Sequence, residues 1–254
     1  MSRFPSPVSL SAVAVDPRAG LFNSLHADVW HANSLATPMA QVVATGTRVL
    51  DAQLPGGGWP VGALTELLQA PHQHNEWRLL APALARCGTA VVVLVAPPHV
   101  PFGPALTARG VAAQRLLWVQ PLVAAQRLWA TEQALRCTGV DAVLAWLPQV
   151  RADQLRRLQM AAHEYNRLLF VMRPSAARQE SSPAVLRLEL EPDVAGLADS
   201  ASKVDSLRVH ILKRRGPPLD QAICLPACEP ALALLLAAQP PLQETQHALD
   251  CAEA

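Results

Sequence analysis

Lysine is nearly absent from this sequence: the 254 residues include only Lys203 and Lys213, although lysine and arginine together number 21. Acidic residues number 20, so the net charge is +1 and no strong field draws the chain toward nucleic acid or a membrane surface. Charged residues make up only 16% of the chain and hydrophobic residues 51%. This composition excludes an intrinsically disordered protein and indicates a folded globular one.

Long apolar runs and a secretory leader are also missing. No apolar stretch reaches about 18 residues without a polar break, so we expect no transmembrane helix and no membrane partner. Residues 1–20 lack a basic start followed by a long apolar core, so we expect no secretory signal. The five cysteines are odd in number and widely spaced, which favours a reducing cytoplasm over a disulfide framework. The sequence therefore predicts a cytoplasmic protein.

The residues that are present predict alternating strands and helices. The run Thr89–Ala96, "TAVVVLVA", is typical of a strand buried on both faces. Strands alternating with helices of about 10–15 residues indicate βαβ units on a parallel sheet. Three later strands with inside–outside alternation are expected at its edge, partly antiparallel. The expected strands are 62–68, 89–96, 115–119, 141–147, 167–172, 184–191, 206–214 and 221–225, and the expected helices are 75–87, 101–109, 122–137 and 151–166.

The domain organisation follows from these segments. We expect one α/β core domain over residues 41–228. Residues 1–40, rich in proline, serine and alanine, are expected to form a flexible N-terminal arm. Residues 229–254 are expected to form a C-terminal tail with a short apolar helix at Ala231–Ala238. That helix would either cap the domain or dock onto a partner.

The loop after the first predicted strand is the place where an open parallel sheet would bind a ligand. Residues 69–76 read Gln-Ala-Pro-His-Gln-His-Asn-Glu, with no glycine, lysine, serine or threonine. A phosphate loop needs glycines that let backbone N–H groups surround the phosphate, a lysine, and a hydroxyl for the metal. No Gly-x-x-x-x-Gly-Lys occurs anywhere in the chain. A standard phosphate loop is therefore excluded, and Glu76 would repel phosphate.

The ends of two other predicted strands also lack the expected acids. Near the end of the strand 141–147 stands Trp146, where nucleotide hydrolases of this architecture carry a magnesium-binding carboxylate. The strand 89–96 is followed by Pro97, Pro98 and His99 in place of a catalytic carboxylate. We therefore predict that the chain is not an enzyme and has no cofactor.

Two further expectations concern tryptophan and metal. Trp118, Trp129 and Trp146 are expected to lie in the core. The pairs His72-x-His74 and Cys224-x-x-x-Cys228 lack a recognised zinc spacing, so no metal is expected.

The segment "TGTRVLDAQLPGGGWPVGALTELL", Thr45–Leu68, resembles the entry to the core of RecA-type recombinases. The resemblance continues through "RCGTAVVVLVA", "GVDAVLAWL" and "NRLLFVMRP", and covers roughly residues 40–226. Within that class, "LPGGGWP" and "NEWRLLAPALAR" closely resemble the ImuA family. That family is RecA-like, is associated with translesion DNA synthesis, and is sometimes labelled SulA-like after the cell-division inhibitor.

This resemblance implies a RecA-like, mostly parallel sheet flanked by helices, with a degenerate P-loop NTPase-type core. His74, Asn75 and Glu76 stand where the RecA pattern has glycine, lysine and threonine. Trp146 stands at the magnesium-aspartate position, and Arg173 stands where a nucleotide-sensing glutamine is expected. The connections after the strands 141–147 and 167–172, which hold DNA-binding loops in recombinases, are short here. ATP hydrolysis is therefore not carried over.

The densest positive cluster is Lys213, Arg214 and Arg215, in "RVHILKRRGPP". It resembles the basic strand that reaches the neighbouring subunit's nucleotide in RecA filaments. Three interpretations stay open. The cluster is a solvated strand end, a contact for an acidic partner or a RecA-like neighbour, or a contact for DNA phosphates.

The family resemblance implies a non-catalytic adaptor in damage-induced (SOS), error-prone translesion DNA synthesis. The implied partners are an inactive Y-family polymerase homologue of the ImuB type, an error-prone C-family DNA polymerase, and RecA. The alternative is a SulA-like inhibitor of cell division that binds the tubulin-like division protein. A third hypothesis is a nucleotide-hydrolysing enzyme with an unfamiliar site.

Overall fold

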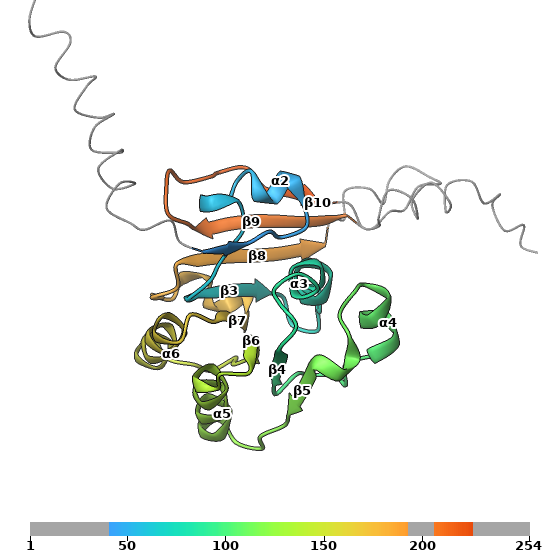
Figure 1. Cartoon of the computed structure of the whole chain (residues 1–254). Coiled ribbons are helices and arrows are strands. Elements are labelled where there is room, and N and C mark those ends of the chain that lie inside the picture. Colours follow the sequence, from blue (N-terminus) through green and yellow to red (C-terminus); the bar gives the residue numbers. More distant parts are fainter. Residues whose placement is uncertain (1–40, 193–205, 226–254) are drawn as a thin grey trace, which may run out of the picture. The chain divides into compact units, whose positions relative to one another are not determined.

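The computed structural model of this protein describes residues 41–192 and 206–225. The predicted N-terminal arm, 1–40, and the predicted apolar tail, 229–254, lie outside the described residues. The described part is built around an eight-stranded sheet with helices packed on it (Figure 1). No helix within the described residues is long and apolar enough to cross a membrane.

The sheet has the order β10-β9-β8-β3-β7-β6-β4-β5. The six strands from β8 to β5 are parallel, β9 is antiparallel to β8, and β10 is antiparallel to β9. The predicted mostly parallel α/β sheet with an antiparallel edge is therefore confirmed. The strands are β3 (Ala63–Gln69), β4 (Val91–Val95), β5 (Leu116–Val119), β6 (Val140–Trp146), β7 (Leu168–Pro174), β8 (Leu186–Pro192), β9 (Leu207–Lys213) and β10 (Ile223–Leu225).

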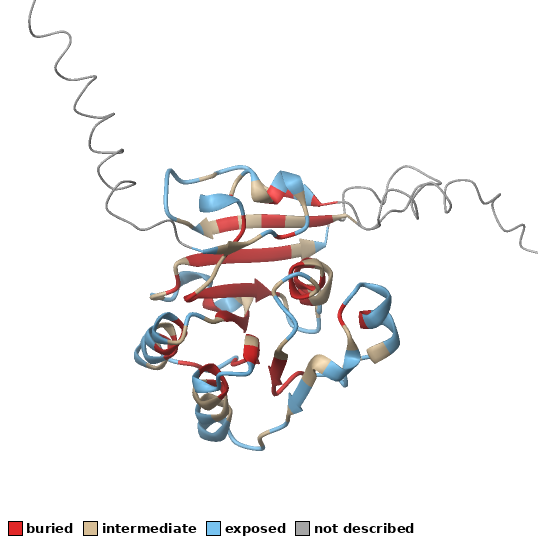
Figure 2. Ribbon diagram, in the orientation of Figure 1, coloured by how far each residue is buried: buried red, intermediate tan, exposed pale blue. Residues whose placement is uncertain are grey.

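Helices cover both faces of the sheet because side chains of each central strand alternate between two cores. In β6, Leu144 joins the core beneath α3, whereas Val143 joins the core beneath α5 and α6. Figure 2 shows the central strands as buried and the outer sides of the helices as exposed. The helices are α2 (Arg48–Asp51), α3 (Glu76–Leu84), α4 (Gly103–Ala108), α5 (Ala124–Arg136) and α6 (Ala152–Glu164).

The glycine turn "LPGGGWP" follows α2 and leads into β2, the second strand of a short antiparallel pair. Gly56 and Gly57 have φ values of 78° and 80°, which glycine adopts without the clash that a Cβ would bring. Gly58 is extended, and a Cβ there would lie 2.4 Å from the Val43 carbonyl oxygen. The turn thus lets β2 (Trp59–Pro60) pair with β1 (Val42–Val43).

The indole of Trp59 anchors this turn in the core. The side chain is fully buried and meets the Phe170 ring edge to face, with 5.3 Å between ring centroids. The short helical turns of the domain are η1 (Pro55–Gly57), η2 (Ala113–Arg115) and η3 (Ser175–Gln179).

The expectation that three tryptophans lie in the core is wrong for two of them. Trp146 is buried, but Trp118 is 44% and Trp129 65% exposed. Trp118 lies on β5, the edge strand, which has a sheet neighbour on one side only among the described residues. Trp129 lies on the outer side of α5. An apolar side chain shows a preference for burial, but whether a neighbouring element covers it depends on the tertiary structure.

Candidate functional site

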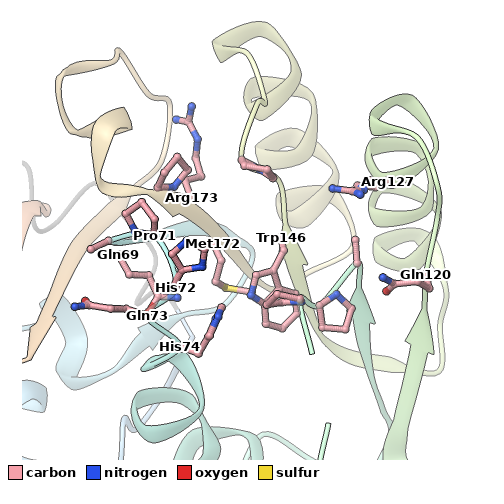
Figure 3. A pocket seen from close by; sticks show the side chains of 16 residues that line it. Gln69, Pro71, His72, Gln73, His74, Gln120, Arg127, Trp146, Met172 and Arg173 are labelled. Atoms are coloured by element: carbon pink, nitrogen blue, oxygen red, sulfur yellow. The ribbon is translucent and has the colours of Figure 1, made fainter. Parts of the chain in front are cut away.

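A pocket of about 300 Å³ lies at the carboxyl edge of the parallel strands, where open α/β sheets bind ligands (Figure 3). Loops from five strands meet there, so residues far apart in sequence share one cavity. None of the lining residues is acidic. The contributions are residues 69–74 from β3, 96–98 from β4, Gln120 and Arg127 from β5 and α5, Trp146 and Pro148 from β6, and 172–174 from β7.

The loop between β3 and α3 is closed by its own side chains. Gln69 Nε2 donates to Glu76 Oε2 at 2.7 Å, and the Asn75 backbone N–H donates to Gln69 Oε1 at 3.0 Å. Glu76 is only 1% exposed. The Glu76 carboxylate therefore lies inside the loop at the N-terminus of α3. A phosphate bound at that position would need positive charge around it.

His74, Asn75 and Glu76, the residues expected to form the degenerate phosphate loop, lie in three different positions. His74 lines the pocket, and its Nδ1 lies 3.8 Å from Glu76 Oε1. Asn75 contributes its backbone N–H to the loop closure. Glu76 is buried behind the pocket wall. His74 also contacts His99, which follows β4, with the two rings perpendicular and their centroids 4.5 Å apart. This contact joins the loops after β3 and β4.

Trp146 ends β6, the position predicted from the sequence, and forms part of the pocket floor. Figure 3 shows its indole among the side chains that line the pocket, with Met172 and His74. The ring is tilted against that of Trp77, with 6.3 Å between centroids. Its Nε1 is buried without a hydrogen-bond partner among the described residues, and so is Gln73 Oε1. The side chain fills space and offers no ligand to a metal ion.

Arg173, at the end of β7, lines the pocket but its guanidinium is already paired. It donates to Glu66 at 3.2 Å, to Glu180 at 2.6 Å and to the Val150 carbonyl at 3.1 Å. Glu66, fully buried in the middle of β3, also accepts a 2.6 Å hydrogen bond from Arg187 of β8. The network joins three strands and fixes the pocket wall at Arg173.

Sequence reasoning missed this ion network and the lining residues Gln120 and Arg127. The sequence does contain a signal for this network, because charged residues stand inside otherwise apolar strands, in "LTELL" and "LRLEL". A buried charge needs a partner, so such residues predict an ion pair, although not which one. No sequence signal pointed to Gln120 and Arg127, because the loop after β5 reaches the pocket only through the sheet order.

The basic cluster does not converge on the pocket. Because β9 is antiparallel to β8, Lys213 lies opposite Arg187 near the start of β8, away from the carboxyl edge. Lys213 Nζ donates to the Ser182 carbonyl at 2.9 Å. Arg214 donates to the carbonyls of Pro217 and Gln53. Arg215 is exposed.

Of the histidine and cysteine pairs, Cys228 lies outside the described residues. No group of three histidine, cysteine or acidic side chains that could hold a metal occurs among residues 41–192 and 206–225. Cys224 and Cys137 are exposed. Cys87 is half-buried, and burial raises the pKa of its thiol above the usual value of 9.0, despite a hydrogen bond from Arg115 that acts in the opposite direction.

No protein-family profile matches the chain. The cell division inhibitor SulA of Photorhabdus laumondii is 32% identical over 111 residues, which is 34% of this chain and 63% of that protein. SulA of Edwardsiella piscicida is 29% identical over 119 residues, which is 46% of this chain and 71% of that protein. An FMN-dependent NADH:quinone oxidoreductase of Nocardia farcinica is 35% identical over 68 residues, 27% of this chain and 32% of that protein.

The chain thus spans less than two thirds of the length of the Photorhabdus relative. The oxidoreductase match covers about a third of that enzyme and carries no argument about the pocket. Over part of its length, this chain is distantly homologous to the cell division inhibitors named SulA.

Proposed function

We propose that this chain is a non-catalytic, RecA-like accessory protein of the response to DNA damage, which acts by binding other proteins. The observation that carries the proposal is the hydrogen bond between Gln69 and Glu76, which places a buried carboxylate inside the loop at the end of β3. A triphosphate there would meet negative charge and no lysine. The sheet order and the parallel strands β8 to β5 are compatible with a RecA-type core.

The finer proposal is an ImuA-type role as an adaptor in damage-induced, error-prone translesion synthesis. Its support is the sequence resemblance in "LPGGGWP" and "NEWRLLAPALAR" together with the homology to SulA. On this proposal the partners are the ImuB-type polymerase homologue, the error-prone C-family polymerase and RecA. The exposed Arg215 at the basic strand end is a candidate contact with such a partner or with DNA.

The adaptor role is tested by a pull-down of the purified full chain on the immobilised ImuB-type homologue. We expect retention of the wild type and reduced retention of Arg215→Glu if the basic cluster contributes. Arg156→Glu, on the exposed side of α6, is the matched control for the change of charge. Absence of any retention of the wild type overturns the adaptor role.

The non-catalytic character is tested separately by calorimetric titration with Mg-ATP. We expect no saturable heat, because nothing in the loop 69–76 neutralises the phosphates. A measured ATP turnover that is lost on changing His74 or Glu76 would instead support the third hypothesis, a nucleotide-hydrolysing enzyme with an unfamiliar site.

A second candidate, inhibition of cell division, is favoured by the homology to two SulA proteins. On this hypothesis the partner is the tubulin-like division protein. Overproduction of the full chain in cells that lack the translesion polymerases would then block septation and give filaments. If cells that overproduce the chain divide normally, and the chain is retained on the polymerase homologue, the adaptor role is supported and inhibition of cell division is rejected.

A further inference from the structure

Part of the pocket wall comes from a long segment of the chain that carries no negative charge. Residues 77–131 contain five arginines and no aspartate or glutamate. This segment supplies the pocket walls at 96–98 and at Gln120 and Arg127. The pocket lining itself contains no acidic residue. The lining side chains therefore bring positive charge and no negative charge to the pocket, although the buried Glu76 carboxylate lies behind its wall.

Arg127 is the lining cation that is not neutralised by the protein. Its Nε makes one long contact, 3.5 Å, with the Pro121 carbonyl, and no described carboxylate pairs with it. Arg173, by contrast, is paired with Glu66 and Glu180. Arg127 thus has donors left for a carboxylate from outside the chain.

Exposed apolar side chains follow or separate lining residues in the sequence. Val100 and Phe102, 68% and 70% exposed, follow the lining residues 96–98 on the same loop. Leu122 and Val123, 87% and 53% exposed, lie between the lining residues Gln120 and Arg127. We call these four residues the apolar rim. Large apolar side chains that stay exposed on loops next to a cavity indicate a surface for protein contact.

We propose that the pocket and the apolar rim bind a short segment of a partner protein in which a large apolar side chain stands beside one or more carboxylates. The apolar side chain enters the pocket between Pro97, Pro98 and Trp146, and a carboxylate pairs with Arg127. The inference rests on the proposed function as a protein-binding factor and assigns the chemistry of the partner's contact.

The pocket walls favour this occupant over a nucleic acid. Five prolines and Trp146 give rigid apolar walls, which suit a leucine, isoleucine or aromatic side chain. One unpaired arginine can neutralise a carboxylate, whereas a nucleic acid backbone requires a track of cations.

The probe is a phage-displayed library of random dodecapeptides, panned against the immobilised full chain. We expect enrichment of peptides that combine leucine, isoleucine or an aromatic residue with neighbouring aspartate or glutamate. Synthetic peptides of the enriched sequences are then titrated by fluorescence anisotropy. Their affinity should fall as the salt concentration rises, because the ion pair with Arg127 is partly exposed.

Two variants and one control locate the site. Leu122→Glu and Arg127→Glu should each weaken peptide binding by about tenfold or more, since one removes a rim contact and the other reverses the charge. Met160→Glu is the matched control, because Met160 is 66% exposed on α6, outside the pocket and the rim. Circular dichroism of each variant shows whether it is folded; Leu122 and Met160 are exposed and Arg127 is half-buried, so each position should tolerate the change.

Other outcomes overturn the inference. The inference is wrong if the panning enriches no peptides that combine an acidic with a large apolar residue. It is also wrong if the enriched peptides bind Leu122→Glu and Arg127→Glu as tightly as they bind the wild type. Binding of oligothymidylate that Arg127→Glu abolishes would show a nucleic-acid surface instead. Self-association in sedimentation that Leu122→Glu abolishes would show that a second copy covers the rim. Retention on the polymerase homologue that both variants leave unchanged would keep the proposed function and reject this site.

Discussion

Gln69 and Glu76 are joined side chain to side chain across the loop that follows β3, with Gln69 Nε2 2.7 Å from Glu76 Oε2 and both residues buried. This pair holds the loop closed without a ligand. A phosphate loop is held by the phosphate that it binds; here the protein supplies the acceptor itself. The two ends of the loop, Gln69 and Glu76, are consequently anchored in the fold, and the residues between them form one wall of the pocket.

Loss of the Gln69 amide should destabilise the fold. Gln69→Leu leaves the buried Glu76 carboxylate without its hydrogen-bond donor, so we expect the free energy of unfolding to fall by about 1–3 kcal/mol. Urea unfolding followed by circular dichroism measures the change. Gln73→Leu is the matched control, because its buried Oε1 has no partner to lose. Equal stability of Gln69→Leu and wild type would show that the pair does not hold the loop.

Removing one partner from the buried ion network around Glu66 should destabilise the fold. Arg187→Met removes the 2.6 Å hydrogen bond to Glu66 and leaves Arg173 as the main partner of that carboxylate. We expect a loss of about 3–5 kcal/mol of unfolding free energy, since an incompletely paired charge stays buried. Thermal and urea unfolding measure it. Arg151→Met, which breaks an exposed surface pair with Asp153, should leave the unfolding midpoint unchanged.

The third glycine of "LPGGGWP" should not accept a side chain. In Gly58→Ala the new Cβ would lie 2.4 Å from the Val43 carbonyl oxygen, a backbone atom that cannot move away freely. We expect a loss of about 1–3 kcal/mol from this overpacking. Gly139→Ala is the control, because no heavy atom lies within 4 Å of a Cβ at that position. An unfolding curve of Gly58→Ala that overlays that of Gly139→Ala would contradict the turn geometry.

The cysteines of the described domain should differ in reactivity. Burial raises the pKa of the Cys87 thiol, so its thiolate fraction at mildly alkaline pH is below that of an ordinary cysteine. Cys137 and Cys224 are exposed. With limiting iodoacetamide and peptide mass mapping, we expect alkylation of Cys137 and Cys224 well before Cys87. Alkylation of Cys87 at the same rate as Cys137 would contradict this burial.

The raised pKa of the Cys87 thiol also makes the stability of the fold depend on pH. The folded state favours the protonated Cys87, so this contribution to stability is present below the thiol's ordinary pKa of 9.0 and is lost as the pH rises through the raised value. We therefore expect Cys87→Ala to reduce the loss of stability on going to alkaline pH. Urea unfolding at neutral and alkaline pH compares the two proteins.

The sequence by itself determined the order and type of the strands and helices from β3 onward, although not the short elements β1, α2 and β2, and the chemistry that the loop after β3 lacks. Runs such as "TAVVVLVA" predict a strand because they depend only on neighbours along the chain. The turn "PGGG" is likewise local, since its backbone angles require glycine. The missing lysine and glycines of residues 69–76 exclude a standard phosphate loop whatever the fold.

Only the tertiary structure decided which side chains meet. It paired Glu66 with Arg187 across more than a hundred residues, placed the basic strand end away from the pocket, and left Trp118 and Trp129 exposed. Burial and electrostatic pairing depend on which strands become neighbours in the sheet. That choice is made by packing of the whole domain, and no window of sequence contains it.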